Sequence, residues 1–334
     1  MKPNLKVKIG KLELKNPVMV ASGTFGYADE FKDFIDLRKL GAIVTKTITL
    51  KPRQGNPAPR TCESPAGMLN SIGLENPGID KFIKEKIPFI RKIGVPLIVS
   101  IASESGLDEF IGLARRLDAV KEVAAMELNI SCPNIKKNPQ STPRLRSGQA
   151  VHSRQKNKNC GLPTADRGLM ISQDAQATYE LVKMVRKVTK KTLITKLSPN
   201  VTDITEIAQA AESAGTDALA LINTLSGMCI DVKTRKPRIA MVSGGLSGPA
   251  IRPIAVRMVW DVFKKVKIPI IGMGGITDTQ SALEFFIAGA SCISVGTANF
   301  INPKTTIEII TGLKEYLAQN KIKDIKELIG NLKV

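Results

Sequence analysis

The sequence predicts an α/β fold of the (β/α)8 TIM-barrel type. Eight short apolar runs rich in β-branched residues alternate with amphipathic stretches, the pattern of parallel strands covered by helices. The eight runs occupy residues 17–22, 42–47, 96–102, 125–131, 192–198, 218–224, 269–275 and 292–297. A doubly wound open sheet is the structural alternative, but no GxGxxG sequence follows the first run, as a dinucleotide-binding sheet would require.

The segments between and around these runs complete a single domain spanning residues 1–334. Amphipathic stretches at 172–188 and 203–215 predict helices, and the second ends on a glycine, as a helix terminus should. Residues 6–16 alternate around Gly10-Lys11 and predict a small hairpin before the barrel. Residues 52–80, rich in Pro, Gly and Asn, predict a long excursion over the carboxyl-terminal face, and the tail beyond Pro303 predicts two amphipathic helices.

Composition restricts the class of protein. With 43% hydrophobic residues in 334, the chain can bury a large core. No apolar run approaches the roughly 20 residues needed to span a bilayer, and the first residues lack the apolar segment of a signal peptide, so a cytoplasmic location is expected. The five cysteines never show a CxxC spacing, which indicates reduced thiols and no metal or iron–sulfur site on this chain.

The net charge of +19 raises the question of an anionic partner. Residues 136–167 contribute eight Lys or Arg side chains against one Asp, and the rest of the charge is spread along the helices. Aromatic residues make up only 4% of the chain and offer few stacking surfaces, so nucleic-acid binding is not expected. The basic segment at about 138–167 lacks periodicity and predicts a mobile insert.

The most informative run is AMELNISCPN at 125–134, which brings Asn129, Ser131, Cys132 and Asn134 to the end of one strand. The chain has a single histidine, His152, inside the basic segment. If the protein moves protons, Cys132 is therefore the leading candidate for the base. The alternative is a buried structural cysteine, but such a site would not need polar neighbours.

Polar or glycine residues end every predicted strand, where a barrel builds its active site. They are Ser22-Gly23, Lys46-Thr47, Ser100, Asn129 with Cys132, Lys196, Asn223-Thr224, Gly274-Gly275 and Gly296-Thr297. The glycines, together with SGGLSGP at 243–249, predict a phosphate site. Two lysines within apolar strands indicate a ligand with delocalised negative charge, and Asn70, Asn129, Asn134 and Asn223 could recognise a small planar ring rich in amides.

These motifs resemble those of the dihydroorotate dehydrogenases, flavin enzymes of pyrimidine synthesis. The resemblance rests on NPVMVASGTFGY (16–27), TKTITLKPRQGNPAPR (45–60), NSIGLENPG (70–78), ELNISCPN (127–134), TKLSPNVTDI (195–204), INTLSGM (222–228), GGLSGPAIRP (244–253) and IIGMGGI followed by GASCISVGTANF. It covers nearly the whole chain apart from about 138–167. The cysteine loop is similar to the class 1 enzymes, and ASGTFGY with SIGLENPG is most similar to class 1B, the NAD-linked subfamily.

The resemblance implies FMN as the cofactor and Cys132 as the base that removes the C5 proton of dihydroorotate, while hydride passes from C6 to the flavin. It implies a substrate site made of Lys46, Asn70, Ser71, Ile72, Gly73, Leu74, Asn129, Asn223 and Thr224. The implied flavin site is Ser22, Lys46, Thr47, Asn129, Lys196, Ile222, Gly248, Gly274, Gly275, Gly296 and Thr297, with Lys196 near the N1–C2=O edge. It further implies a homodimeric core flanked by a partner subunit that carries FAD and a 2Fe–2S cluster.

The sequence departs from the family pattern at two places. Ser100 stands where the family usually has Asn, which is expected to weaken one flavin contact, and the basic insert splits the cysteine loop from GLMISQDA at 168–175. An FMN-dependent tRNA dihydrouridine synthase, a fumarate-linked class 1A enzyme, a relative of dihydropyrimidine dehydrogenase and an inactive FMN-binding scaffold remain alternatives. The dihydrouridine synthase would explain the positive charge, but the chain lacks an added RNA-binding helical domain.

Overall fold

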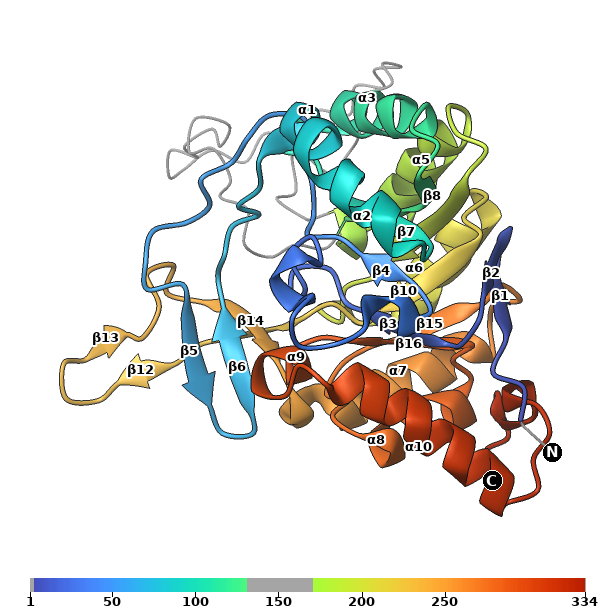
Figure 1. Cartoon of the computed structure of the whole chain (residues 1–334). Coiled ribbons are helices and arrows are strands. Elements are labelled where there is room, and N and C mark those ends of the chain that lie inside the picture. Colours follow the sequence, from blue (N-terminus) through green and yellow to red (C-terminus); the bar gives the residue numbers. More distant parts are fainter. Residues whose placement is uncertain (1–2, 131–170, 334) are drawn as a thin grey trace, which may run out of the picture.

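The computed structural model describes residues 3–130 and 171–333 and contains an eight-stranded parallel sheet closed into a barrel (Figure 1). The barrel strands are β3 (Val18–Val20), β4 (Ile43–Val44), β7 (Leu97–Ile101), β8 (Val123–Asn129), β9 (Thr192–Lys196), β10 (Ala218–Leu221), β15 (Ile270–Gly272) and β16 (Cys292–Val295). The last strand pairs with the first, and a bridge between Met19 and Ala42 joins β3 to the β4 side. All eight predicted strands and the predicted fold class are confirmed.

Helices surround the barrel (Figure 1). The main ones are α2 (Ile87–Ile93), α3 (Leu107–Asp118), α5 (Ala175–Arg186), α6 (Ile204–Ser213), α7 (Arg252–Phe263), α8 (Thr279–Ala288) and α10 (Thr305–Gln319). The predicted helices at 172–188 and 203–215 correspond to α5 and α6. Each begins at an aspartate, Asp174 or Asp203, whose side chain accepts a hydrogen bond from a backbone N–H of the first turn, which satisfies a donor left without a helical partner.

The barrel strands are apolar because both of their faces are covered. Every residue of β7 and of β9 is buried, as expected when side chains on one face fill the barrel and those on the other meet the helices. Phe285 and Phe286 of α8 are fully buried in the same core. Each such phenylalanine contributes about 1.5–3 kcal/mol by its removal from water.

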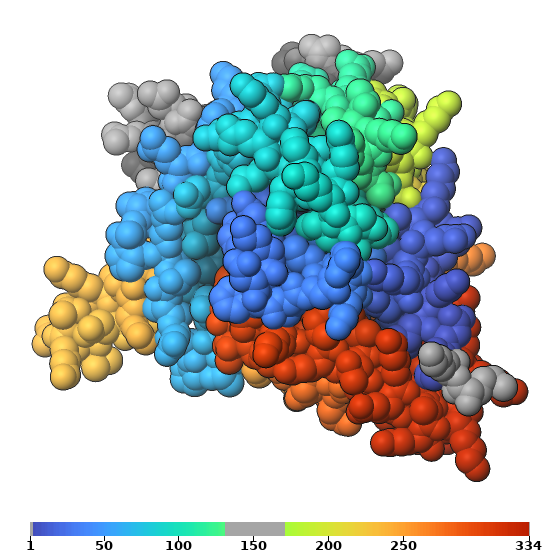
Figure 2. All heavy atoms as spheres, viewed as in Figure 1, coloured from blue at the N-terminus to red at the C-terminus, as the bar shows by residue number. Residues whose placement is uncertain are grey.

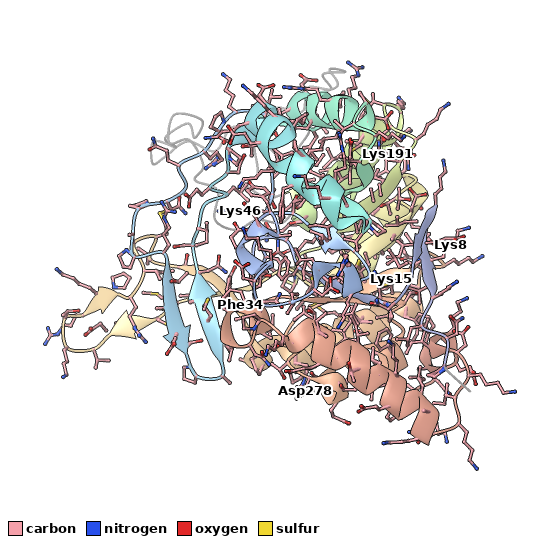
Figure 3. The ribbon with its side chains drawn as sticks, viewed as in Figure 1. Lys8, Lys15, Phe34, Lys46, Lys191 and Asp278 are labelled. Atoms are coloured by element: carbon pink, nitrogen blue, oxygen red, sulfur yellow. The ribbon has the colours of Figure 1, made fainter. Side chains whose placement is uncertain are left out.

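The predicted hairpin at 6–16 is confirmed and closes the amino-terminal end of the barrel. Its strands β1 (Val7–Ile9) and β2 (Leu12–Leu14) are antiparallel, with alternate residues buried. The backbone N–H of Lys11 donates to the hydroxyl of Thr192, the first residue of β9, at 3.1 Å. Lys8 lies between the buried positions and extends into solvent (Figure 3).

A second sheet lies over the opposite, carboxyl-terminal end. It contains β5 (Thr61–Ser64), β6 (Gly67–Asn70), β11 (Leu225–Gly227) and β14 (Gly244–Ser247), in the order β11-β14-β6-β5. The predicted excursion at 52–80 therefore carries β5 and β6 and then enters helix α1 (Gly78–Lys81). A further hairpin of β12 (Ile230–Asp231) and β13 (Lys236–Pro237) projects from the body of the molecule (Figures 1 and 2).

The prediction of two tail helices is half correct. Helix α10 is present, but the second segment is a short 3-10 turn, Ile325–Leu328. Asp324 caps this turn and also lies beside Asn4 in a parallel bridge, so packing against the amino-terminal segment holds the backbone there. Gly330, with φ of +70°, ends the turn by donating to the backbone oxygen of Phe286 at 3.0 Å.

Several expectations from the sequence fall on residues that the structure leaves undescribed. They are the mobile insert at about 138–167 and the positions of Ser131, Cys132 and Asn134. Within 3–130 and 171–333, no helix combines the length and apolar character needed to cross a membrane.

Candidate active site at the carboxyl end of the barrel

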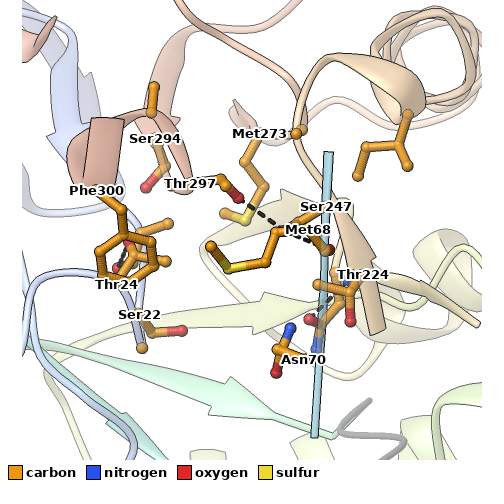
Figure 4. A pocket seen from close by; sticks show the side chains of 18 of the residues that line it. Ser22, Thr24, Met68, Asn70, Thr224, Ser247, Met273, Ser294, Thr297 and Phe300 are labelled. Atoms are coloured by element: carbon orange, nitrogen blue, oxygen red, sulfur yellow. Dashed lines mark hydrogen bonds between the residues drawn. The ribbon is translucent and has the colours of Figure 1, made fainter. Parts of the chain in front are cut away.

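A cavity of about 310 Å³ opens at the carboxyl ends of the barrel strands. Among the described residues, every barrel strand except β7 contributes to its wall, either through its last residues or through the segment that follows it. The second sheet contributes through Met68 and Asn70 of β6 (Figure 4). The volume lies at the lower end of the range typical of small-molecule sites, which is about 300–1,000 Å³. In a (β/α)8 barrel this end is where chemistry is carried out.

The structure brings nearly all of the predicted site residues to this cavity. Those on its wall are Ser22, Lys46, Thr47, Asn70, Ile72, Gly73, Leu74, Asn129, Lys196, Ile222, Asn223, Thr224, Gly248, Gly274, Gly275, Gly296 and Thr297. Ser71 is fully buried outside the wall, and its backbone N–H donates to Arg60. Cys132 lies outside the described residues. The ligand that each residue contacts stays a prediction.

Lys196 reaches across the mouth of the barrel. It ends β9, which lies opposite β3 in the closed sheet, and its Nζ donates to the hydroxyl of Ser22 after β3 at 2.9 Å. Only 4% of Lys196 is exposed, and an ammonium group so far removed from water is costly unless it is paired or faces an anion. The second lysine of the wall, Lys46, is half-buried.

The loop after β3 supports Lys46. The backbone oxygen of Gly26 accepts a hydrogen bond from the backbone N–H of Lys46 at 2.8 Å. Lys86 anchors the same loop through an ion pair with Asp29 at 2.8 Å. The hydrogen bond to Asp29 raises the pKa of the Lys86 ammonium, against the opposing effect of burial. The side chain of Lys46 therefore starts from a fixed backbone position.

Three carboxamides meet on one side of the cavity. The amide nitrogen of Asn223 donates to the oxygen of Asn129 at 3.4 Å, and that of Asn70 donates to the backbone of Gly245 at 3.1 Å. The Asn223 oxygen accepts from the backbone N–H of Thr224 at 2.8 Å. Since a carboxamide carries both donors and an acceptor, this side suits a planar ligand with alternating N–H and C=O groups.

Glycines form the other side. Gly248 and Gly275 have φ of +95° and +73°, and a Cβ on Gly275 would lie 2.8 Å from the backbone oxygen of Gly248. The loops after β14 and β15 therefore pack backbone against backbone. Close by, the hydroxyl of Thr297 donates to that of Ser247 at 2.8 Å (Figure 4). Backbone N–H groups and hydroxyls brought together without side-chain bulk form a suitable cradle for a phosphate.

Several apolar residues of the wall were not predicted from the sequence. Met68, Met273 and Phe300 line the cavity (Figure 4). Met273 precedes the predicted Gly274, and Met68 lies two residues before the predicted Asn70 on β6, so alternation along a strand could have indicated it. Phe300, in α9 (Ala298–Ile301), is 54% exposed at the rim, and nothing in the sequence pattern singled it out.

Ser100 has a different position from the other strand ends. It lies within β7, is fully buried and does not line the cavity. Its hydroxyl donates to Glu127 at 2.9 Å and lies 3.0 Å from that of Thr47. Ser100 therefore lies beneath the cavity wall. The expectation that serine at this position weakens a flavin contact stays a prediction.

Comparison with known proteins identifies the family. A model of the family described as dihydroorotate dehydrogenase matches residues 4–317. The chain is 49% identical over 333 residues to a protein of Geotalea daltonii, covering 100% of this chain and 99% of that one. It is 50% identical over 332 residues to a protein of Trichlorobacter lovleyi, with 99% of both chains covered. Both relatives carry the name dihydroorotate dehydrogenase B (NAD(+)), catalytic subunit.

The closed barrel and the cavity at its carboxyl end define a (β/α)8-barrel enzyme. The cavity wall combines two lysines, three asparagine amides and a glycine cradle within a largely apolar lining. The chain belongs to the dihydroorotate dehydrogenase family of oxidoreductases. The family match favours a dihydroorotate dehydrogenase over the dihydrouridine synthase alternative. The names of the two relatives favour the NAD-linked class over the fumarate-linked class 1A.

Proposed function

We propose that the protein oxidises (S)-dihydroorotate to orotate, a step of pyrimidine synthesis, as the catalytic subunit of an NAD-linked enzyme. The family membership and the names of the relatives support this activity. The observation that carries the proposal is the meeting of two lysines and three asparagines in one cavity at the carboxyl end of the barrel. Orotate is a planar anion with ring N–H and C=O groups, and this set of side chains complements both properties.

The wall also fits FMN, the cofactor that we assign to it. The glycine cradle at Gly248 and Gly275 suits the phosphate, and Lys196 suits a ring that gains negative charge. Met68 and Met273 offer apolar contacts for the ring system. Bound FMN would supply the two-electron chemistry by accepting the hydride from C6 of dihydroorotate.

The amide side of the cavity would hold the substrate. Asn70, Asn129 and Asn223 would bond to the N–H and C=O edges of the ring, while Lys46 would face its carboxylate. The segment Ile72–Leu74 would cover the ring from the second sheet. Ser71 would act through its backbone position, since its side chain is buried away from the cavity. These contacts would orient C5 and C6 before the reaction.

Cys132 is the base that we assign to the removal of the C5 proton. It follows Asn129 by three residues in the sequence, in the segment ELNISCPN. A thiolate rather than a thiol accepts the proton, so the reaction should become faster as pH rises toward the ordinary thiol pKa of about 8.5. Loss of the C5 proton and of the C6 hydride together removes two electrons and leaves the double bond of orotate.

The electrons would leave through a partner subunit that carries FAD and a 2Fe–2S cluster. The word "subunit" in the names of the relatives supports a partner, and we further propose a homodimeric core flanked by two partner chains. Within 3–130 and 171–333, no group of three or more His, Cys, Asp or Glu residues could hold a metal ion.

The test combines cofactor identity with product formation. The flavin released from the purified chain is separated by chromatography, and orotate is followed by its absorbance after addition of dihydroorotate and an artificial electron-accepting dye. The proposal predicts FMN, orotate formation with the dye, and NAD reduction only after the partner subunit is added. Flavin-loaded protein that forms no orotate in the presence of dihydroorotate and the dye would contradict the proposed activity.

A further inference from the structure

A continuous chain of hydrogen bonds runs from the cavity into the barrel interior. Asn223 donates to Asn129 at 3.4 Å, and Asn129 donates to the hydroxyl of Thr47 at 3.1 Å. That hydroxyl lies 3.0 Å from the hydroxyl of Ser100. The Ser100 hydroxyl in turn donates to the carboxylate of Glu127 at 2.9 Å. We call these five side chains the Glu127 chain.

The two ends of the Glu127 chain differ in their surroundings. Asn223, Asn129 and Thr47 line the cavity. Ser100 and Glu127 lie on adjacent strands in direct register, are 0% and 3% exposed, and do not line it. Glu127 and Asn129 are two residues apart on β8, so they face the same side of the sheet, with Glu127 one step deeper in the barrel.

A buried carboxylate at this position requires an explanation. Placing an ionisable group in a barrel core costs free energy unless hydrogen bonds to the group offset that cost. The proposed function assigns Glu127 no contact with substrate or flavin. What Glu127 does provide is a terminus that accepts the Ser100 hydroxyl hydrogen. A carboxylate oxygen cannot donate one in return.

The Glu127 carboxylate determines the donor and the acceptor of each hydrogen bond in the Glu127 chain. Because the Ser100 hydroxyl gives its hydrogen to Glu127, its oxygen is left to accept from Thr47. The Thr47 oxygen then accepts from the amide nitrogen of Asn129. The Asn129 oxygen is consequently turned toward Asn223. The orientation of a carboxamide is set by such a network, since its two ends have nearly the same shape.

We propose that Glu127 is a positioning residue that, through Ser100 and Thr47, fixes the amide orientation of Asn129 for binding the substrate ring. Its neighbour Asn223 is oriented separately, because its oxygen accepts from the backbone N–H of Thr224. This inference rests on the proposed function, because it takes dihydroorotate and orotate as the ligands of those two asparagines. Reversal of the Asn129 amide would present an oxygen where the ring needs a donor, or the converse. Each mismatch of this kind leaves a buried polar group unpaired.

Glu127→Gln in the full chain tests the proposal. Glutamine has nearly the same shape but can donate through its amide nitrogen. The Ser100 hydroxyl is then released to donate to Thr47, and Thr47 no longer constrains the orientation of the Asn129 amide. The readout is the dissociation constant of orotate, measured by its effect on the absorption spectrum of the bound flavin. We expect it to rise about tenfold, with a parallel rise in KM for dihydroorotate and an unchanged flavin content.

Ser100→Ala provides the second variant, since it interrupts the chain at a side chain that does not line the cavity. It should raise the orotate dissociation constant in the same way, so the test survives if Glu127→Gln fails to fold. The matched control is Thr195→Val. Thr195 is fully buried on the neighbouring strand β9, and its hydroxyl donates at 3.0 Å to Thr216, which is not a member of the Glu127 chain.

The outcomes separate the two claims. Folded Glu127→Gln and Ser100→Ala proteins with the orotate affinity of wild type would overturn the role of Glu127 and leave the proposed function standing. A loss of affinity in Thr195→Val as large as in Ser100→Ala would also overturn it, since general destabilisation would then explain both. Wild-type protein that retains flavin but neither binds orotate nor oxidises dihydroorotate would instead overturn the proposed function.

Discussion

Lys196 and Ser22 join opposite sides of the barrel mouth by a hydrogen bond of 2.9 Å. The two residues are 174 positions apart in sequence and follow strands that lie opposite each other in the closed sheet. The lysine side chain therefore reaches from the end of β9 across the cavity to the segment after β3. A ligand lying beside Lys196 would meet a cation that is already in place. No free energy of reorganisation is then needed to bring it there during the reaction.

Replacement of Lys196 by methionine should slow flavin reduction by dihydroorotate roughly 10²-fold, because the cation that stabilises developing charge is lost. Methionine keeps most of the length and apolar stem, so the fold should be retained. Stopped-flow absorbance under anaerobic conditions measures the rate. Lys183→Met, which removes an exposed charge on α5, should leave it unchanged, and equal rates in both variants and wild type would contradict the role of Lys196.

A methyl group at Gly275 should weaken flavin retention. In Gly275→Ala the new Cβ would lie 2.8 Å from the backbone oxygen of Gly248 and would force the cradle apart. Gly94→Ala is the control: its φ of +72° matches the +73° of Gly275, but a Cβ there meets nothing within 4 Å. Both variants should lose roughly 1 kcal/mol of stability through strain at positive φ, and only Gly275→Ala should lose flavin on dialysis. Equal retention by both proteins would argue against a cradle at this position.

Cys132→Ser should slow reduction of the bound flavin by roughly 10²- to 10⁴-fold near neutral pH, because a hydroxyl is a far weaker base than a thiolate. Flavin content should stay constant. Rates are compared over a range of pH, and the rise of the wild-type rate with pH should disappear in the variant. Cys229→Ser, which alters a half-buried thiol away from the cavity wall, is the control. A Cys132→Ser protein with the wild-type rate would remove Cys132 from the role of base.

Glu109 supplies a prediction for stability against pH. Burial raises the pKa of its carboxyl, but hydrogen bonds from the backbone N–H groups of Glu104, Leu50 and Ser105 outweigh burial and lower the pKa below its ordinary value. They measure 2.8, 3.0 and 3.1 Å and tie the loop after β4 to the start of α3. The stabilisation is therefore present above the unfolded-state pKa of about 4.3 and is lost as pH falls through the folded-state pKa.

Glu109→Gln should therefore destabilise the protein at pH 7 by about 1–3 kcal/mol, since an amide can accept on only one side. The difference from wild type should shrink as the pH is lowered below 4. Urea unfolding at both pH values measures it, with Glu315→Gln on the exposed face of α10 as the control. A difference that stays constant with pH would show that charge at Glu109 is not involved.

The sequence predicted the barrel because its eight strands are buried on both faces and so appear as continuous apolar runs, such as TLITK in β9. The cavity wall was predicted largely for the same reason, since strand ends are local features and fold class places them together. Met68 was missed because its approach depends on the pairing of β6 with β14, which is not local. Glu127 was missed because its partner Ser100 is set by the register of β7 on β8.

Two further differences arise from hydrogen bonds between segments that are separated in the sequence. Ser71 sits between two cavity residues, but its backbone pairs with Arg60 at 2.7 Å and this turns the side chain inward. The second tail helix was predicted from its amphipathic pattern, and the segment instead forms a 3-10 turn because Asp324 is held beside Asn4 and Gly330 ends the turn. In both places hydrogen bonds to distant segments decide the backbone, which periodicity alone does not reveal.

The most direct measurement is an anaerobic titration of the purified, flavin-loaded chain with dihydroorotate in the absence of any acceptor. The account predicts that the absorption band of the oxidised flavin bleaches and that one orotate appears for each flavin reduced. A bound flavin that stays oxidised in excess dihydroorotate would contradict the central claim that this cavity oxidises dihydroorotate.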